Sequence, residues 1–201
     1  MKLSYICTIK TGLVLHRKKA ATYDDVQIHY KLLSLKAFNN STSLDSDYID
    51  AFMASEELDS SYISQVGDIV VRLRAPIQAV YIDEDSKGLI VPSLMSIIRL
   101  KDDTMIDAEY LAYYLNSSEV QRPLKKKIKG TTIPMVKTTD LNDIDVVLPP
   151  IQVQKDLVAY LKLSEKEIHL LEKLKEKKVN LSKELLDTMI QQTKENPHAK
   201  N

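Results

Sequence analysis

Two arginines in the middle of the sequence are spaced so that both could contact the same ligand. Arg72 and Arg74 lie two residues apart in the stretch GDIVVRLRAP, where residues 69–73 are predicted to form a strand. Because side chains alternate along a strand, both arginines should leave on one face about 7 Å apart, with Val71 and Leu73 in the core. Such a guanidinium pair suits guanine edges or adjacent phosphates. The alternative is that both arginines pair with a nearby acidic loop.

The densest basic stretch is RPLKKKIKGTT, which begins at Arg122 and ends in a Gly-Thr-Thr turn. Its lysines could hold phosphates, and so could the backbone amides and hydroxyl groups of the turn. On helical spacing the same lysines could equally form a solvated face. A smaller basic cluster covers residues 17–19. The candidate contacts to nucleic acid are therefore Arg17, Lys18, Lys19, Arg72, Arg74, Lys125, Lys126, Lys127, Lys129, Thr131 and Thr132.

The residue types that form nucleotide-binding loops and metal sites are too few or too scattered in this sequence for a catalytic site. The four glycines of the chain cannot form a dinucleotide fingerprint or a phosphate-cradling loop, because both need closely spaced glycines. The four scattered histidines and the one cysteine offer no metal-ligand spacing. We therefore expect no catalytic residue, no metal and no cofactor in this chain.

Two enzyme classes can be weighed against that expectation. A metal-dependent nuclease could use Asp68, Asp85 and Lys87, in which one acid is followed later in the sequence by the pattern acid-any-lysine. Such a pattern arises by chance in a chain in which 28% of the residues are charged. A methyltransferase has less support still, since the Asn-Pro-Pro or Asp-Pro-Pro aromatic motif and the glycine loop for S-adenosylmethionine are both absent. The basic residues are better explained by binding than by catalysis.

A mixed set of strands and helices must position these residues. Residues 107–117 have helical spacing of apolar side chains, with Asp107 as the N-cap. Residues 41–61 are rich in serine and acid, contain no lysine or arginine, and are predicted to form an exposed loop with a short helix. Strands are predicted near residues 5–9, 27–33 and 69–73, and from Leu89 to Leu100 with an interruption at Pro92. The sequence therefore predicts an α/β fold.

Length and composition indicate one domain with an appendage. A chain of 201 residues with 44% hydrophobic content can bury one core of ordinary size. Its 28 basic residues balance 28 acids, so any basic surface must be local. Cys7 has no partner for an intramolecular disulfide, the N-terminus lacks a signal peptide, and the apolar run at residues 88–98 is far shorter than the roughly 18 residues of a membrane helix. We expect a soluble cytoplasmic protein with no membrane partner.

The C-terminal part of the sequence is predicted to be one long helix. After the pair Pro149 and Pro150, no glycine or proline occurs up to residue 192, and apolar residues recur three or four apart. Such a helix would be about 60 Å long, too long to bury its apolar stripe on a domain with a radius of gyration of about 15 Å. It needs a partner helix, unless it folds back on its own domain. The predicted coiled-coil seam comprises Leu157, Leu161, Ile168, Leu171, Leu174, Leu181 and Leu185.

The order of these motifs resembles one half of a type I restriction-modification specificity subunit, meaning a target-recognition domain followed by a spacer helix. The resemblance rests on GDIVV, then KGTTIP, then LNDIDVVLPPIQVQ before the long helix. Its most specific element is the turn at Gly67 and Asp68, followed at the family's usual distances by Gly130, Pro149, Pro150 and Gln154. It implies a DNA target-recognition domain at residues 1–150, a spacer and dimerisation helix at 151–193, and a disordered tail at 194–201.

The resemblance also implies a role without catalysis, in which the chain reads one half of a bipartite site in double-stranded DNA. Its partners would be modification subunits, which bring S-adenosylmethionine and the methyl-transfer chemistry, and a restriction subunit can join them. The chain departs from the family in length, because the usual subunit has two recognition domains and two spacer helices. The simplest arrangement is a homodimer with antiparallel helices, whose bipartite site is an inverted repeat.

Two alternatives stay open at this point. The chain could be a non-DNA adaptor with a protein-binding head on a dimerising coiled coil, which its neutral net charge favours slightly. It could also be a mimic of a specificity subunit that sequesters the partner subunits. Salt-sensitive binding to duplex DNA separates the adaptor from a protein that reads DNA.

Overall fold

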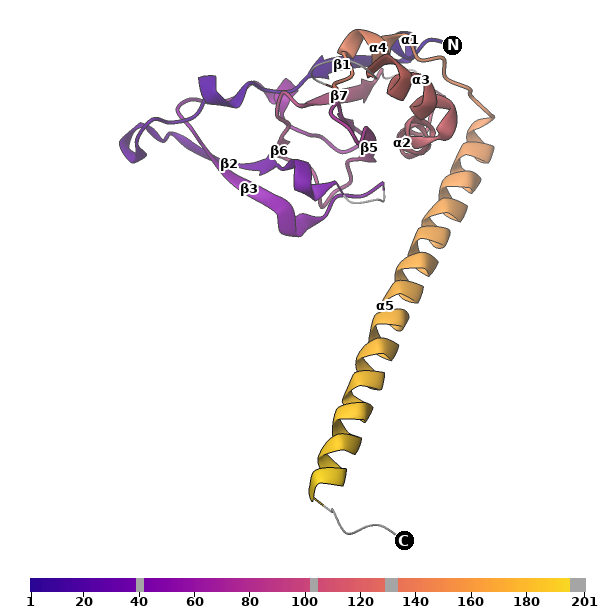
Figure 1. Ribbon diagram of the computed structural model, residues 1–201. Coiled ribbons are helices and arrows are strands. Elements are labelled where there is room, and N and C mark those ends of the chain that lie inside the picture. Colours follow the sequence, from indigo (N-terminus) through magenta and orange to yellow (C-terminus); the bar gives the residue numbers. More distant parts are fainter. Residues whose placement is uncertain (39–41, 102–104, 129–133, 196–201) are drawn as a thin grey trace. The chain divides into compact units, whose positions relative to one another are not determined.

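The computed structural model describes residues 1–38, 42–101, 105–128 and 134–195, and it divides into a compact unit of residues 1–158 and a second unit from residue 159 onward (Figure 1). The first unit is a mixed α/β domain with two sheets, as the sequence predicts. The second unit continues the long helix α5, which spans Ile151–Glu195. No helix in the described part of the chain combines the length and the apolar character needed to cross a membrane.

The larger sheet has four antiparallel strands in the order β1-β7-β4-β5. Its central strand β4 reads as a continuous apolar run because both of its faces are covered: Ile69 and Val70 are fully buried and Val71 nearly so. Alternate side chains of β4 enter two separate core clusters, one on each face of the sheet. The strands are β1 Cys7–Thr11, β4 Ile69–Arg72, β5 Gln78–Tyr81 and β7 Met95–Leu100.

Four short helices pack on one face of the larger sheet and enclose the first of these clusters (Figure 1). The N-cap predicted at Asp107 is confirmed, since its Oδ1 accepts a hydrogen bond from the backbone N of Tyr110 at 2.9 Å. Where this helix ends, the side chain of Asn116 bonds both the N–H and the C=O of Ala79 in the edge strand β5, at 2.8 and 2.7 Å. The helices are α1 Leu3–Ile6, α2 Ala108–Asn116, α3 Ser118–Ile128 and α4 Thr138–Asn142.

The smaller sheet has the strand order β3-β2-β6, with β2 antiparallel to β3 and parallel to β6. The second core cluster lies on the other face of the larger sheet, where it includes Leu33 from the end of β2 and Val80 from β5. The strands are β2 Ile28–Leu33, β3 Ile49–Ala54 and β6 Leu89–Ile90. Single 3-10 turns occupy η1 Leu15–Arg17, η2 Tyr23–Asp25, η3 Leu35–Ala37, η4 Ser46–Tyr48 and η5 Ser60–Tyr62.

Three element predictions need correction. The first strand begins only at Cys7, because α1 occupies the residues before it. The stretch 41–61 was predicted to be a loop with a short helix, but it contains strand β3, which pairs along all six residues of β2. The interrupted strand from Leu89 to Leu100 is two strands in different sheets, β6 and β7.

A close backbone approach explains why β6 and β7 separate. Between them, Leu13 forms a β-bridge with Pro92. A Cβ at the neighbouring Gly12 would lie 2.3 Å from the backbone oxygens of Val91 and Pro92, so only glycine allows the two segments to approach this closely.

Candidate nucleic-acid interface

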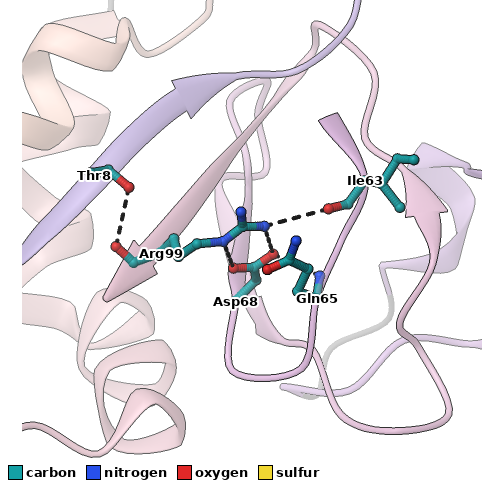
Figure 2. Close-up of polar contacts among 5 residues, drawn as sticks. All are labelled: Thr8, Ile63, Gln65, Asp68 and Arg99. Carbon is teal, nitrogen blue, oxygen red and sulfur yellow. Dashed lines mark hydrogen bonds and ion pairs between the residues drawn. The ribbon is translucent and has the colours of Figure 1, made fainter. Parts of the chain in front are cut away.

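The Gly67-Asp68 turn is a structural joint between β4 and β7. The Asp68 carboxylate is 1% exposed, and the Arg99 guanidinium donates Nε and Nη2 to its two oxygens at 2.7 Å each (Figure 2). The backbone N of Gln65 donates to the same carboxylate at 2.7 Å. Gly67 has a φ of +89°, which favours glycine. The hydrogen bond from Arg99 to Asp68 raises the pKa of the arginine above its ordinary value, so the guanidinium stays charged.

These contacts argue against the nuclease reading of Asp68, Asp85 and Lys87. Asp68 is saturated by Arg99, and Lys87 forms its own ion pair with Glu84 at 2.6 Å. Within the described ranges, no group of three or more histidine, cysteine, aspartate or glutamate side chains is placed to hold a metal. Burial raises the pKa of the Cys7 thiol to about 12, so this side chain is no nucleophile at neutral pH.

The predicted outward pair Arg72 and Arg74 is not formed. Arg72 is the last residue of β4, and it is half-buried on the face of the second core cluster, with Nη1 3.5 Å from the backbone oxygen of Leu35. Its Nη2 lies 3.4 Å from the backbone oxygen of Ala75, and its Nε is buried with no hydrogen-bond partner among the described residues. Arg74 lies beyond the strand and is exposed. Only Arg74 therefore has the accessibility that contact with DNA requires.

Arg74 lies beside the segment that follows the Gly-Thr-Thr turn. It forms an antiparallel bridge with Met135, and the backbone N of Val136 donates to the oxygen of Leu73 at 2.9 Å. Sequence spacing alone did not single out Lys137, which is exposed at the start of α4 in this same segment. The antiparallel bridge places the segment that contains Lys137 beside Arg74, although the two residues are far apart in the sequence. The predicted contacts Lys129, Thr131 and Thr132 lie outside the described residues.

The last turn of α3 presents the three lysines predicted from the basic stretch. All three are exposed, while Leu124 and Ile128 of the same helix are buried. Lys127 donates to Asp140 of α4 at 2.8 Å, which raises the pKa of the lysine and helps to lower that of the carboxyl. Lys125 and Lys126 form no ion pair within the described part of the chain.

The N-terminal cluster at residues 17–19 has a more acidic setting. Lys18 forms an ion pair with Glu56, and with Arg17 it lines an open hollow that also contains Glu57 and Asp59. Lys19 is exposed and forms a bridge with the end of β3. Since the acids repel phosphate, this cluster is a weaker candidate than the α3–α4 surface.

Helix α5 exposes more apolar surface than a single seam. The predicted seam residues Leu157, Ile168, Leu171, Leu174, Leu181 and Leu185 are 41–58% exposed, and Leu161 is half-buried. Other apolar side chains on the helix are exposed to a similar degree: Val153, Tyr160, Leu163, Leu170, Val179, Leu186 and Ile190. Unless another chain packs against it, such an apolar helix leaves a large hydrophobic surface exposed to solvent.

The sequence matches a family model described as type I restriction modification DNA specificity domain over residues 1–180, which includes the α/β domain and α5 up to that residue. The chain therefore belongs to this family of type I restriction-modification specificity proteins. Among curated proteins, none matches the chain significantly in sequence.

Solved structures share the fold. The HsdS subunit from Thermoanaerobacter tengcongensis is 16% identical, with a TM-score of 0.66 over 94% of this chain and 47% of that one. The S subunit of a type I system from M. genitalium is 14% identical, with a TM-score of 0.52 over 87% and 40%. A chain from a study of assembly and conformational transition in the type I R-M system is 17% identical, with a TM-score of 0.63 over 92% and 42%. This chain spans less than half the length of each.

Proposed function

We propose that this protein is the DNA-binding specificity subunit of a type I restriction-modification system and that it reads one half of a bipartite site. The observation that carries the proposal is the family match, which continues from the α/β domain into α5. On this proposal, residues 1–150 recognise DNA and residues 151–193 form the spacer helix. Of the tail expected at 194–201, residues 194 and 195 belong to α5 and the others lie outside the described residues.

The DNA-facing surface is proposed to surround the connection between α3 and α4. The Lys127–Asp140 bridge joins these helices, and the Arg74–Met135 bridge brings β4 to the same connection. The exposed cations there are Arg74, Lys125, Lys126 and Lys137. The basic stretch of the sequence also predicts contacts from Lys129, Thr131 and Thr132, which lie outside the described residues. Cations of this kind bind phosphates in a sequence-independent way and set the register in which a few side chains read base edges.

A homodimer is proposed to supply the second half of the recognition unit. Because α5 exposes many apolar side chains, two copies that pair α5 antiparallel would bury this surface. A two-fold dimer presents the same reading surface twice, so the site becomes an inverted repeat. Replacing Leu171, Leu174 and Leu181 with glutamate should halve the mass in solution. An unchanged mass in the triple variant would rule out this helix as the dimer interface.

Modification subunits are the proposed partners, and they supply S-adenosylmethionine and the methyl-transfer chemistry while this chain takes no part in catalysis. A restriction subunit is a further partner in complexes that cleave DNA. The test is to co-express the chain with a type I modification subunit from the same organism and measure co-purification and duplex binding. A stable complex that binds DNA less tightly as salt rises supports the proposal. Binding to neither the modification subunit nor DNA would refute it.

The adaptor alternative keeps one observation in its favour, which is the balance of 28 basic and 28 acidic residues. It predicts a partner complex whose formation requires no DNA and a chain that leaves duplex DNA unbound at low salt. A mimic that sequesters modification subunits would instead form the partner complex and abolish its methylation of DNA. Co-purification, duplex binding and a methylation assay of the complex together separate the three roles.

A further inference from the structure

A buried glutamine fixes the point where α5 begins. Gln154 lies in the first turn of the helix, and its side chain is 0% exposed. Its Oε1 accepts a hydrogen bond from the backbone N of Asp107 at 2.9 Å. Its Nε2 donates to the backbone oxygens of Pro149 at 2.8 Å and Met105 at 3.1 Å. Both amide protons of this side chain are therefore used, and the carbonyl oxygen is bonded as well.

The three partners of Gln154 belong to two segments that are distant in the sequence. Pro149 comes directly before the helix, whereas Met105 and Asp107 lead into α2. Asp107 is itself the N-cap of α2 and holds the backbone N of Tyr110. A continuous set of hydrogen bonds thus runs from the first turn of α5 through one side chain to the first turn of α2.

Two tyrosines of α2 reinforce the same connection. Tyr110 donates its hydroxyl to the backbone oxygen of Val147, and Tyr114 donates to that of Asp145, both at 2.9 Å. The connector before α5 is therefore attached to α2 at several points. The compact unit accordingly extends beyond the proline pair, through the first two turns of α5 to Val158.

The proposal follows from this geometry and rests on the proposed function. We propose that Gln154 is a positioning residue that makes the first two turns of α5 part of the recognition domain. In a dimer joined through α5, this fixed junction gives the protein a strict preference for one spacing between half-sites. Loss of the junction should leave half-site recognition intact and relax the preference for spacing, because a looser connection lets two domains reach sites at several separations.

The experiment compares two variants of Gln154 with a matched control in the full chain. Gln154→Met keeps the length of the side chain and removes all three hydrogen bonds. Gln154→Glu keeps an acceptor for Asp107 but places a carboxylate that cannot donate against two carbonyl oxygens. The control is Gln152→Met, because Gln152 is exposed in the same turn and its amide bonds only Asp156 of its own helix, at 2.9 Å.

Two measurements are made on each variant. The first is affinity for a duplex enriched by the wild type from a random pool, for its single half-site, and for derivatives whose spacer is lengthened or shortened by single base pairs. The second is hydrogen exchange at the backbone amide of Asp107 and at residues 154–158. We expect both Gln154 variants to lose about tenfold in discrimination between spacers and to keep half-site affinity within about twofold. Exchange should be faster at these amides, and Gln152→Met should match the wild type.

Several outcomes would overturn the proposal. A spacer profile equal to that of the wild type in both Gln154 variants would show that the junction has no positioning role. Equal loss of half-site and full-site binding would show that Gln154 acts only through the fold of the domain. If the wild type enriches no duplex, the proposed function fails while the junction is still tested by exchange. Identical exchange in Gln154→Met and Gln152→Met would then refute the junction itself.

Discussion

Arg99 of β7 donates two hydrogen bonds of 2.7 Å to Asp68, whose carboxylate is almost completely buried at the start of β4. The Arg99 side chain is 34% exposed, so one side of the pair meets solvent. The motif that gives the chain its clearest family resemblance is thus a joint between two neighbouring strands of the larger sheet. Its function is to hold β4 in place, and β4 leads directly to Arg74.

The first prediction concerns the stability of this joint. Asp68→Asn should lower the free energy of unfolding by about 2 to 3 kcal/mol, because the change leaves the partly buried Arg99 without its counter-charge. Urea unfolding measures the difference. Asp85→Asn is the control, since Asp85 is exposed, and it should change stability by less than about 0.5 kcal/mol. Equal stability of the two variants would mean that the ion pair contributes nothing to the fold.

The second prediction is a pH dependence of the α3–α4 connection. The hydrogen bond from Lys127 is the largest cause that lowers the pKa of Asp140, so the carboxylate stabilises the folded state above its ordinary pKa. This contribution should disappear as pH falls through the lowered folded pKa. The raised pKa of Lys127 adds stability below its ordinary value, which is lost as pH rises through the raised one. The bridge therefore persists across the neutral range.

Acid unfolding of Asp140→Asn tests this sign. The wild type should be more stable than the variant at neutral pH, and the two should converge at strongly acidic pH. Asp24→Asn serves as the control, because Asp24 is exposed in η2, away from this bridge, and should leave the wild-type profile unchanged. A constant difference between wild type and Asp140→Asn at every pH would contradict the assignment.

The sequence predicted elements well where the signal is local. The apolar run of β4, the N-cap at Asp107 and the helix after Pro150 all depend on near neighbours. Strand β3 was missed because its serine-rich and acidic surroundings are typical of loops, while its identity depends on pairing with β2. The half-buried position of Arg72 was missed for a related reason. The alternation of side chains along a strand does not show whether the other face of the sheet meets solvent or is covered by a second core cluster.

The third prediction compares Lys125 and Lys126, which form no ion pair within the described residues, with Lys127, which is paired with Asp140. Lys125→Ala and Lys126→Ala should weaken binding to all duplexes alike and reduce the slope of affinity against salt by about one phosphate each. Lys127→Ala should have a smaller effect, because its ammonium group is already bonded to Asp140. Titrations at several salt concentrations decide this. Lys36→Ala, at an exposed position in η3, is the control, and the same loss in that variant would argue against a localised surface.

The fourth prediction concerns base reading by the arginines. Arg74→Ala should relax discrimination by about 1 to 3 kcal/mol at one base pair, because Arg74 is exposed beside the α3–α4 connection. Arg72→Ala should instead lower stability, since its guanidinium lies against backbone oxygens of the domain. Competition with single-base variants of the enriched duplex measures the first effect. A uniform loss from Arg74→Ala would assign it to phosphate contact.

The most direct test of a half-site reader is to enrich its site from a random duplex pool, using the chain together with a modification subunit from the same organism. We predict a bipartite inverted repeat, with half-site centres about 34 Å apart or a little more along the duplex. The enriched affinity should fall steeply as salt rises. A pool without any enriched sequence, or an asymmetric site read by a monomer of this chain, would contradict this prediction.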